Sequence, residues 1–258
     1  MAKIVIRKVI TMVRIVFLGV GGWISNPYLN QSGIAIESNR GNIILLDVGE
    51  GICKYLNQHN IDISKIIGIF VSHNHGDHIL GIPTLIQLLK HRSLKTRIVS
   101  SNIVINKVIE LLNATSTKFD DVIEFISINI NQDLKLEEFK LRFTEVAHTI
   151  PTLAIRVDVD NICIVYSGDT TYTKNLVKLA RNCDVLIHEV SGYDEMSHVY
   201  GHSTVYDAVR VAYEANVKML ILTHFYIDTP ILKAQILKEL GEKNIDLVLP
   251  HPGYVIEL

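Results

Sequence analysis

Short apolar runs rich in Val and Ile, bounded by Gly, Asn and Asp, recur along the chain and predict β-strands. The expected strands are residues 14–18, 33–37, 43–47, 66–71, 97–99, 139–143, 153–157, 162–166, 185–187, 219–222, 247–249 and 254–256. Apolar residues take the helical period instead at residues 79–90, 103–112, 174–180, 204–215 and 231–240, and a further helix is expected at 51–59. Ser203 or Thr204 is the expected N-cap of the helix at 204–215.

The order of these elements predicts the architecture. Strands that can form meanders come first, alternating strands and helices follow, and strands and helices close the chain. Because sheets and helices must bury their apolar faces against one another, this order predicts an α/β fold with two mixed sheets flanked by helices, an αββα sandwich. We expect residues 1–258 to form a single domain, with residues 1–11 as either an N-terminal extension or an extra edge strand.

Composition narrows the class of protein and its partners. Apolar residues make up 48% of the 258 residues, which is enough for a sizeable core. The net charge of −2 predicts no bulk attraction to nucleic acid, and we expect no DNA partner. One local basic run follows the helix at 79–90, and it indicates either a solvated helix end or a rim that contacts phosphate: Lys90, His91, Arg92, Lys95 and Arg97.

The N-terminal segment is apolar, but Lys3, Arg7, Lys8 and Arg14 interrupt it. No apolar run reaches the roughly 18 residues that a membrane span needs, and no small-residue cleavage site follows the segment. We therefore expect neither a signal peptide nor a membrane partner.

The cysteines are Cys53, Cys163 and Cys183, an odd number with no CxxC pair. This pattern predicts small buried apolar side chains rather than a disulfide framework. Because disulfides are rare in reducing compartments, the pattern favours a cytoplasmic location.

The strongest chemical signal is the HxHxDH segment, which contains His73, His75, Asp77 and His78 and lies between an expected strand and an expected helix. Imidazole nitrogens and carboxylate oxygens are common zinc ligands. Four such groups within six residues exceed what one tetrahedral ion accommodates comfortably, so two ions are expected. Side chains two residues apart in extended backbone share a face, so His73 and His75 would bind one ion. Asp77 and His78, on the turn beyond, would bind the second.

Three more residues follow apolar strand-like runs. His148 follows FKLRFTEVA, Asp169 follows IVYSG, and His224 follows MLILT. A single residue in such a position is more often structural than a ligand. Together with HxHxDH, however, three polar residues at strand ends predict one shared metal centre at an edge of the sandwich.

The combination of HxHxDH, a later His, an Asp within GDT and a final His resembles the metallo-β-lactamase superfamily over nearly the whole chain. The resemblance implies a first ion bound by His73, His75 and His148, a second bound by Asp77, His78 and His224, and a bridge between the ions formed by Asp169. It also implies two Zn²⁺ per chain, with Mn²⁺ or Fe²⁺ as alternatives.

Two positions argue against other branches of this superfamily. The β-lactamases that hydrolyse antibiotics usually carry Cys at the position of Asp169, so that activity is not expected. Flavo-diiron relatives carry Glu at the position of Asn74, so an iron redox site is not expected either.

Further segments resemble the RNase Z branch: LLDVGEG at 45–51, HTIPTLAIRV at 148–157, LIHEV with Glu189, and the GHST segment with His202. In that branch the His donates a proton to the leaving oxygen, and the Glu orients it. The resemblance therefore implies His202 as general acid, Glu189 as its orienting partner, and Asp77 as the residue that orients or deprotonates a metal-bound hydroxide. Ala154 and Ile155 replace the Gly and Tyr that are usual there.

The expected function is therefore that of a metal-dependent phosphodiesterase acting on a small phosphodiester or an RNA 3′ end, with a homodimer as one option. Only 21 positions separate His148 from Asp169, where the tRNA-cutting enzymes insert an arm, and residues 27–32 lack an Arg that is common there. Both departures favour small phosphodiesters over precursor tRNA. Two alternatives stay open: a lactone or thioester hydrolase like glyoxalase II, which does not need the His202–Glu189 pair, and a non-catalytic metal-binding module.

Overall fold

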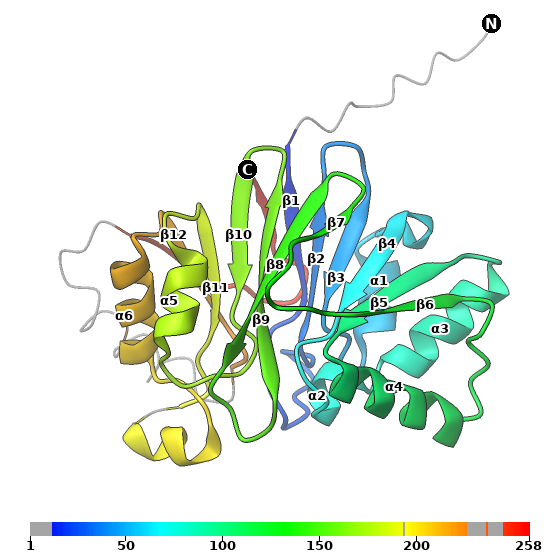
Figure 1. Ribbon diagram of the computed structural model, residues 1–258, viewed down its shortest axis with the longest axis horizontal. Coiled ribbons are helices and arrows are strands. Elements are labelled where there is room, and N and C mark those ends of the chain that lie inside the picture. The colour runs from blue at the N-terminus through cyan, green and yellow to red at the C-terminus, as the bar shows by residue number, and fades with distance from the viewer. Residues whose placement is uncertain (1–11, 193, 226–235, 237–244) are drawn as a thin grey trace, which may run out of the picture.

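The computed structural model describes residues 12–192, 194–225, 236 and 245–258, which form two seven-stranded sheets with helices outside (Figure 1). The expected αββα architecture is confirmed. In spatial order, the first sheet contains β14 (Val255–Glu257), β1 (Arg14–Gly19), β2 (Gly33–Glu37), β3 (Ile43–Leu46), β4 (Ile66–Phe70), β5 (Thr96–Ser100) and β6 (Ile123–Ser127). The second contains β13 (Asp246–Val248), β12 (Met219–Thr223), β11 (Val185–Glu189), β10 (Ile162–Tyr166), β9 (Thr152–Val159), β8 (Phe139–Val146) and β7 (Leu134–Leu136).

Helices flank both sheets in Figure 1. Those beside the first sheet are α1 (Ile52–Gln58), α2 (Gly76–Ile79), α3 (Ile82–His91) and α4 (Asn102–Ala114), and those beside the second are α5 (Lys174–Ala180) and α6 (Val205–Ala215). In the described part of the chain, the 3₁₀ helices η1 (Ile63–Lys65) and η2 (Glu195–Tyr200) lie in loops. Thr204 is the N-cap of α6 and forms a capping box with Asp207.

Many strands are continuous apolar runs because apolar cores cover both of their faces. In β1, Ile15 and Phe17 belong to the core between the sheets, whereas Val16 and Leu18 belong to the core under the helices. Successive side chains of a strand point to opposite faces, so a strand that is covered on both sides needs apolar residues throughout.

The structure differs from the sequence-based expectation in a few elements. β6 and β7 were not expected, and each is an edge strand with partly exposed residues. The helix expected at 79–90 is divided into α2 and α3 around Gly81. The helix expected at 231–240 falls almost wholly outside the described residues, as does the segment 1–11.

The expectation that the cysteines form no disulfide is wrong, because Cys163 and Cys183 are bonded to each other. Their sequence separation of 20 residues is bridged by α5, which returns the chain to the strand beside β10. There β10 and β11 run parallel and pair Ile164 with Val185, so the two cysteines meet at the start of this pair. Both cysteines are buried as expected, at 7% and 0% exposure, and Cys53 is free and buried.

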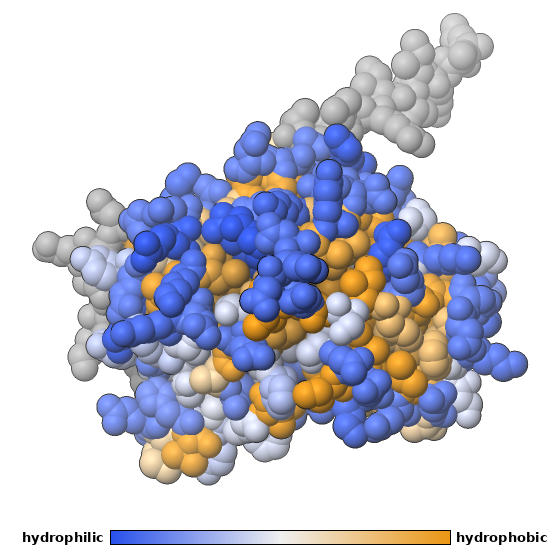
Figure 2. Space-filling model, in the orientation of Figure 1, coloured by the Kyte–Doolittle hydropathy of each residue, from blue (hydrophilic) through white to orange (hydrophobic). Residues whose placement is uncertain are grey.

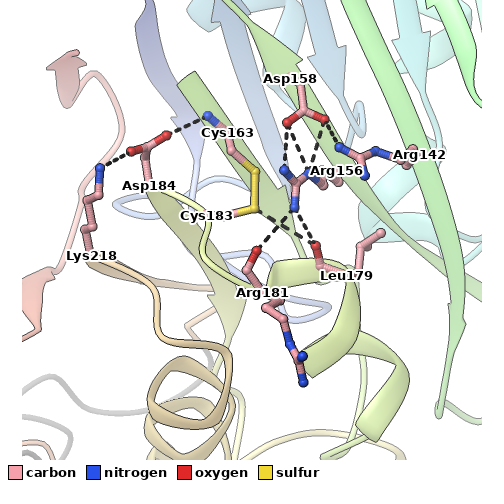
Figure 3. The surroundings of a disulfide bond; sticks show 9 residues. All are labelled: Arg142, Arg156, Asp158, Cys163, Leu179, Arg181, Cys183, Asp184 and Lys218. Carbon is pink, nitrogen blue, oxygen red and sulfur yellow. Dashed lines mark hydrogen bonds and ion pairs between the residues drawn. A yellow bond between two sulfur atoms is a disulfide. The ribbon is translucent and has the colours of Figure 1, made fainter. Parts of the chain in front are cut away.

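Figure 3 shows the surroundings of this disulfide. Asp184, next to Cys183, accepts a hydrogen bond from the backbone N–H of Cys163 at 2.8 Å and one from Lys218 Nζ at 2.7 Å. Because two of the three cysteines form a disulfide, the cysteine pattern no longer favours a reducing compartment.

Within the described part of the chain, no helix is both long and apolar enough to cross a bilayer.

The strand directions place several carboxyl ends at one edge of the sandwich. β10, β11 and β12 are parallel, and β8 shares their direction because β9 is antiparallel to both β8 and β10. In the first sheet, β3 and β4 are parallel. Residues that follow these strands can therefore meet, as the parallel strands of each sheet end together.

Candidate metal centre

The first sheet supplies four polar residues through the segment that follows β4. His73 and His75 lie in the extended stretch after the strand, and His75 is the N-cap of α2. Asp77 and His78 lie in the only turn of α2, and both are buried. Because the chain turns into a helix at Gly76, all four side chains can face the second sheet.

The second sheet supplies three more residues from strand ends. His148 follows β8, Asp169 follows β10 after Gly168, and His224 follows β12. Gly168 has a φ of 57° and His224 a φ of 60°, so the backbone turns sharply at both strand ends. These turns direct Asp169 and His224 towards the first sheet.

All seven residues meet in two groups whose ligand atoms lie within 4.8 Å of one another. One group contains His73, His75, His148 and Asp169, and the other contains Asp77, His78, Asp169 and His224. Asp169 belongs to both, with Oδ2 3.5 Å from His73 Nε2 and Oδ1 3.4 Å from His224 Nε2. The structure thus brings together the two sets that the family resemblance implied, and each set draws residues from both sheets.

The donor atoms fit divalent metal ions. His75 Nδ1 lies 3.1 Å from both His73 Nε2 and His148 Nε2, and His78 Nε2 lies 3.2 Å from His224 Nε2. With metal–nitrogen bonds of 2.0–2.1 Å, ligands of a tetrahedral ion lie about 3.3 Å apart. In addition, Asp169 Oδ1 is buried and has no hydrogen-bond partner among the described residues. A bound cation would compensate this buried oxygen.

The outer nitrogens of the histidines are held by the protein. Asp47, at the end of β3, accepts a hydrogen bond from His78 Nδ1 at 2.7 Å, and also from Ser72 Oγ and Tyr166 Oη at 2.7 and 2.8 Å. Nδ1 of His148 donates to the carbonyl of Gly201 at 2.8 Å. These bonds fix the tautomer that leaves Nε2 unprotonated and facing the centre.

His224 is oriented in the same way by Ser191. The Oγ of Ser191 lies 2.6 Å from His224 Nδ1 and donates to the backbone carbonyl of His224 at 3.0 Å. On the other side of this ring lies Gly22, where a Cβ atom would come within 2.7 Å of His224 Cε1. The absence of a side chain at Gly22 therefore allows the backbone to approach the His224 ring closely.

The contact between Asp47 and the candidate ligand His78 was not foreseen from the sequence. Asp47 lies within LLDVGEG, a segment in which the sequence analysis gave it no role.

Replacing Asp47 with Asn should lower metal affinity about 10- to 100-fold, because the carboxylate that holds His78 is lost. Its φ of 58° suits Asn as well as Asp, so the backbone is retained. Titration with zinc, with Asp62→Asn on the exposed η1 cap as control, measures this. Unchanged affinity would contradict the role.

The histidines of the centre lower the pKa of the two carboxylates that lie among them. Burial raises the pKa of Asp77, but His78 and His224 outweigh it and lower that pKa to about 2. Burial likewise opposes ionisation of Asp169, yet the surrounding histidines hold its pKa well below the usual value. Both carboxylates are therefore negative over a wide pH range, as metal ligands must be.

A second pair of residues lies beside the centre. Glu189, buried at the end of β11, accepts hydrogen bonds at Oε1 from His202 Nδ1 at 3.0 Å and from the backbone N–H groups of Thr170 and Ser203 at 3.0 and 3.1 Å. Burial lowers the pKa of His202, but the bond to Glu189 outweighs it and raises that pKa to about 9. His202 Nε2 is left to donate a proton.

Glu189, His202 and His224 also form a third group of ligand atoms within 4.8 Å. This grouping offers a different interpretation of His202, as a metal ligand instead of an acid. His202 Nδ1 is, however, occupied by Glu189 and lies 4.0 Å from Asp169 Oδ2. The two interpretations differ in whether His202 is needed for metal binding.

A cavity of about 890 Å³ opens onto the centre. The cavity is lined by His75, Asp77, His148, Asp169 and His202, so the candidate ligands and the expected acid are both accessible to a small molecule.

The basic run at the end of α3 does not line this cavity. Lys90 is paired with Asp121 at 2.6 Å and Arg97 with Glu124 at 3.0 Å, which favours its interpretation as a solvated helix end.

Comparisons with known proteins identify relatives of this chain. Residues 42–225 match the family model described as the beta-lactamase superfamily domain. The chain is 29% identical to ribonuclease Z of Picrophilus torridus, over 82% of this chain and 85% of that protein.

Solved structures share the fold, and two of them illustrate the likeness. The metallo-beta-lactamase fold protein YhfI of Bacillus subtilis has a TM-score of 0.82 at 21% identity, covering 95% of this chain and 99% of that one. The short form of human tRNase Z has a TM-score of 0.78 at 23% identity, covering 94% and 98%.

Proposed function

The chain belongs to the beta-lactamase superfamily, and on this basis we propose that it hydrolyses phosphodiesters with two divalent metal ions, zinc being the expected metal. The relatives named ribonuclease Z support this class of reaction. The observation that carries the proposal is the Glu189–His202 pair beside two ligand groups that share Asp169. Phosphodiester cleavage needs a site that neutralises phosphoryl charge and an acid that protonates the leaving oxygen.

Two ions bound in these groups would supply a water of lowered pKa and offset the charge of the phosphoryl oxygens. The residues of the chain do the rest. Asp77, which lines the cavity, orients the attacking water. His202 Nε2 gives its proton to the leaving alkoxide, and Glu189 holds the imidazolium in place through Nδ1. Lactone and thioester hydrolysis does not need this pair, so the pair favours phosphodiesters.

The substrate in this proposal is a small phosphodiester or an RNA 3′ end, and two features support the smaller one. Between His148 and Asp169 the described chain contains the β9–β10 hairpin, which leaves no room for an arm that grips tRNA. The cavity wall also has no Lys or Arg among its described residues. A folded polyanion needs such cations at a distance from the scissile bond.

The experiment combines metal analysis with hydrolysis assays on four substrates. The zinc-supplemented protein is assayed on bis-p-nitrophenyl phosphate, a thioester and a lactone, and on a precursor tRNA at two salt concentrations. We expect about two ions per chain, preference for the phosphodiester, and weak, strongly salt-dependent action on tRNA. Fewer than about one ion per chain, or faster hydrolysis of the thioester or lactone, would contradict the proposal.

A further inference from the structure

The wall of the cavity beside the metal centre is apolar and exposed. Trp23, Leu80, Met196 and Tyr200 line the cavity, and their exposed fractions are 63%, 50%, 63% and 66%. Figure 2 shows orange surface over η2, at the lower left of the molecule; of the exposed apolar residues of this helix, Met196 lines the cavity and Val199 does not. Large apolar side chains left exposed around a polar centre indicate a surface that binds something apolar.

Three loops bring these side chains to the centre. Trp23 follows Gly22, which lies against the His224 ring. Leu80 directly follows α2, which carries Asp77 and His78, and Tyr200 ends η2, two residues before His202. The apolar groups therefore flank the position of a scissile phosphate rather than a remote surface.

The charge of the wall limits what can bind. Among the described residues that line the cavity there is no Lys or Arg, and Asp194 adds a negative charge outside the metal centre. Two divalent ions, offset by the three carboxylates of Asp77, Asp169 and Asp194, would leave a formal excess of one positive charge, which suits a single negative charge. A polyanion would have no counter-charge along this wall.

We propose that this wall binds the non-leaving arm of a singly charged phosphodiester as a flat aromatic group, with Trp23 as the residue that determines the specificity. The inference rests on the proposed phosphodiesterase function and deepens it. An indole ring presents a rigid flat surface at low entropic cost, and stacking with an aromatic ring adds to the burial of apolar area.

The kinetic test uses two substrates with the same charge and the same leaving group, phenyl p-nitrophenyl phosphate and ethyl p-nitrophenyl phosphate. The metal-loaded protein should favour the phenyl ester in kcat/KM. Trp23→Ala should lower the phenyl-to-ethyl ratio about fivefold or more, and Trp23→Phe should retain most of it. Tyr28→Ala is the control. Tyr28 is also aromatic, is 83% exposed and does not line the cavity, so its replacement should leave the phenyl-to-ethyl ratio unchanged.

A binding test separates this inference from the proposed function. Trp23 is the single tryptophan of the chain, so indole fluorescence reports on this wall directly. Diphenyl phosphate should change the fluorescence saturably, whereas diethyl phosphate at the same concentration should not. This discrimination without hydrolysis of any diester would support the inference and reject the proposed function. Hydrolysis with equal responses to both ligands, or a ratio unaffected by Trp23→Ala, would overturn the inference.

Discussion

Replacing Asp169 with alanine is expected to remove metal and phosphodiesterase activity together. Asp169 is the one residue common to both ligand groups, and its Oδ2 lies 3.4 Å from His78 Nε2 and 3.5 Å from His73 Nε2. Without it, each group loses a ligand and the buried histidines lose their counter-charge. The rate should fall at least about a thousandfold, because a water no longer bound to metal has a pKa near 15.7 instead of about 7.

Elemental analysis and the rate on bis-p-nitrophenyl phosphate measure this result. Asp169→Asn keeps the shape of the side chain and should behave alike, which separates loss of charge from loss of fold. Asp121→Ala is the matched control, since this exposed aspartate pairs with Lys90 on the surface and does not line the cavity. An Asp169→Ala protein that keeps two ions and near-normal activity would refute the assignment.

Replacing His202 with alanine is expected to lower the rate roughly 10²- to 10⁴-fold while metal content stays unchanged. The loss should be large for diesters with alkyl leaving groups, whose oxygen needs a proton. It should shrink for p-nitrophenolate, which leaves without one. Metal analysis of the same variant decides between His202 as acid and His202 as ligand of the third group.

His198→Ala provides the control for this experiment. His198 lies on η2, pairs with Asp207 at 2.7 Å and does not line the cavity. Replacing it therefore tests whether loss of a nearby histidine outside the cavity also lowers the rate. The acid role of His202 would be rejected by an equal loss for alkyl and nitrophenyl esters. A loss of metal in His202→Ala would indicate a ligand.

Much of the fold could be predicted because burial on both faces leaves a strong signal in single strands. The strands at Gly33–Glu37 and Ile162–Tyr166 have the bounds expected from their apolar runs. β6 was missed because it is an edge strand with mixed burial, which leaves no clear period. The disulfide was missed because its pairing depends on how α5 returns the chain to the sheet, and the spacing of cysteines carries no trace of that.

In the candidate site, too, residues with a local sequence signal could be predicted, and a residue defined by distant contacts could not. HxHxDH concentrates four ligand-type residues in one segment, so it can be recognised locally, and strand-end positions indicate the others. Asp47 could not be recognised in this way. Its partners Ser72 and His78 lie 25 and 31 residues further along the chain, and a lone aspartate after an apolar run has many ordinary explanations.

The origin of the ligands in both sheets has a consequence for the stability of the protein. His73, His75, Asp77 and His78 belong to one sheet, and His148, Asp169 and His224 to the other, so each ion would fasten the two halves of the sandwich together at their open edge. Since a ligand that binds only the folded state adds RT ln(1 + [L]/Kd), an ion at 1,000 times its Kd would contribute about 4 kcal/mol. Metal depletion would thus loosen this edge as well as abolish hydrolysis, and the cellular supply of metal would govern how long the protein persists.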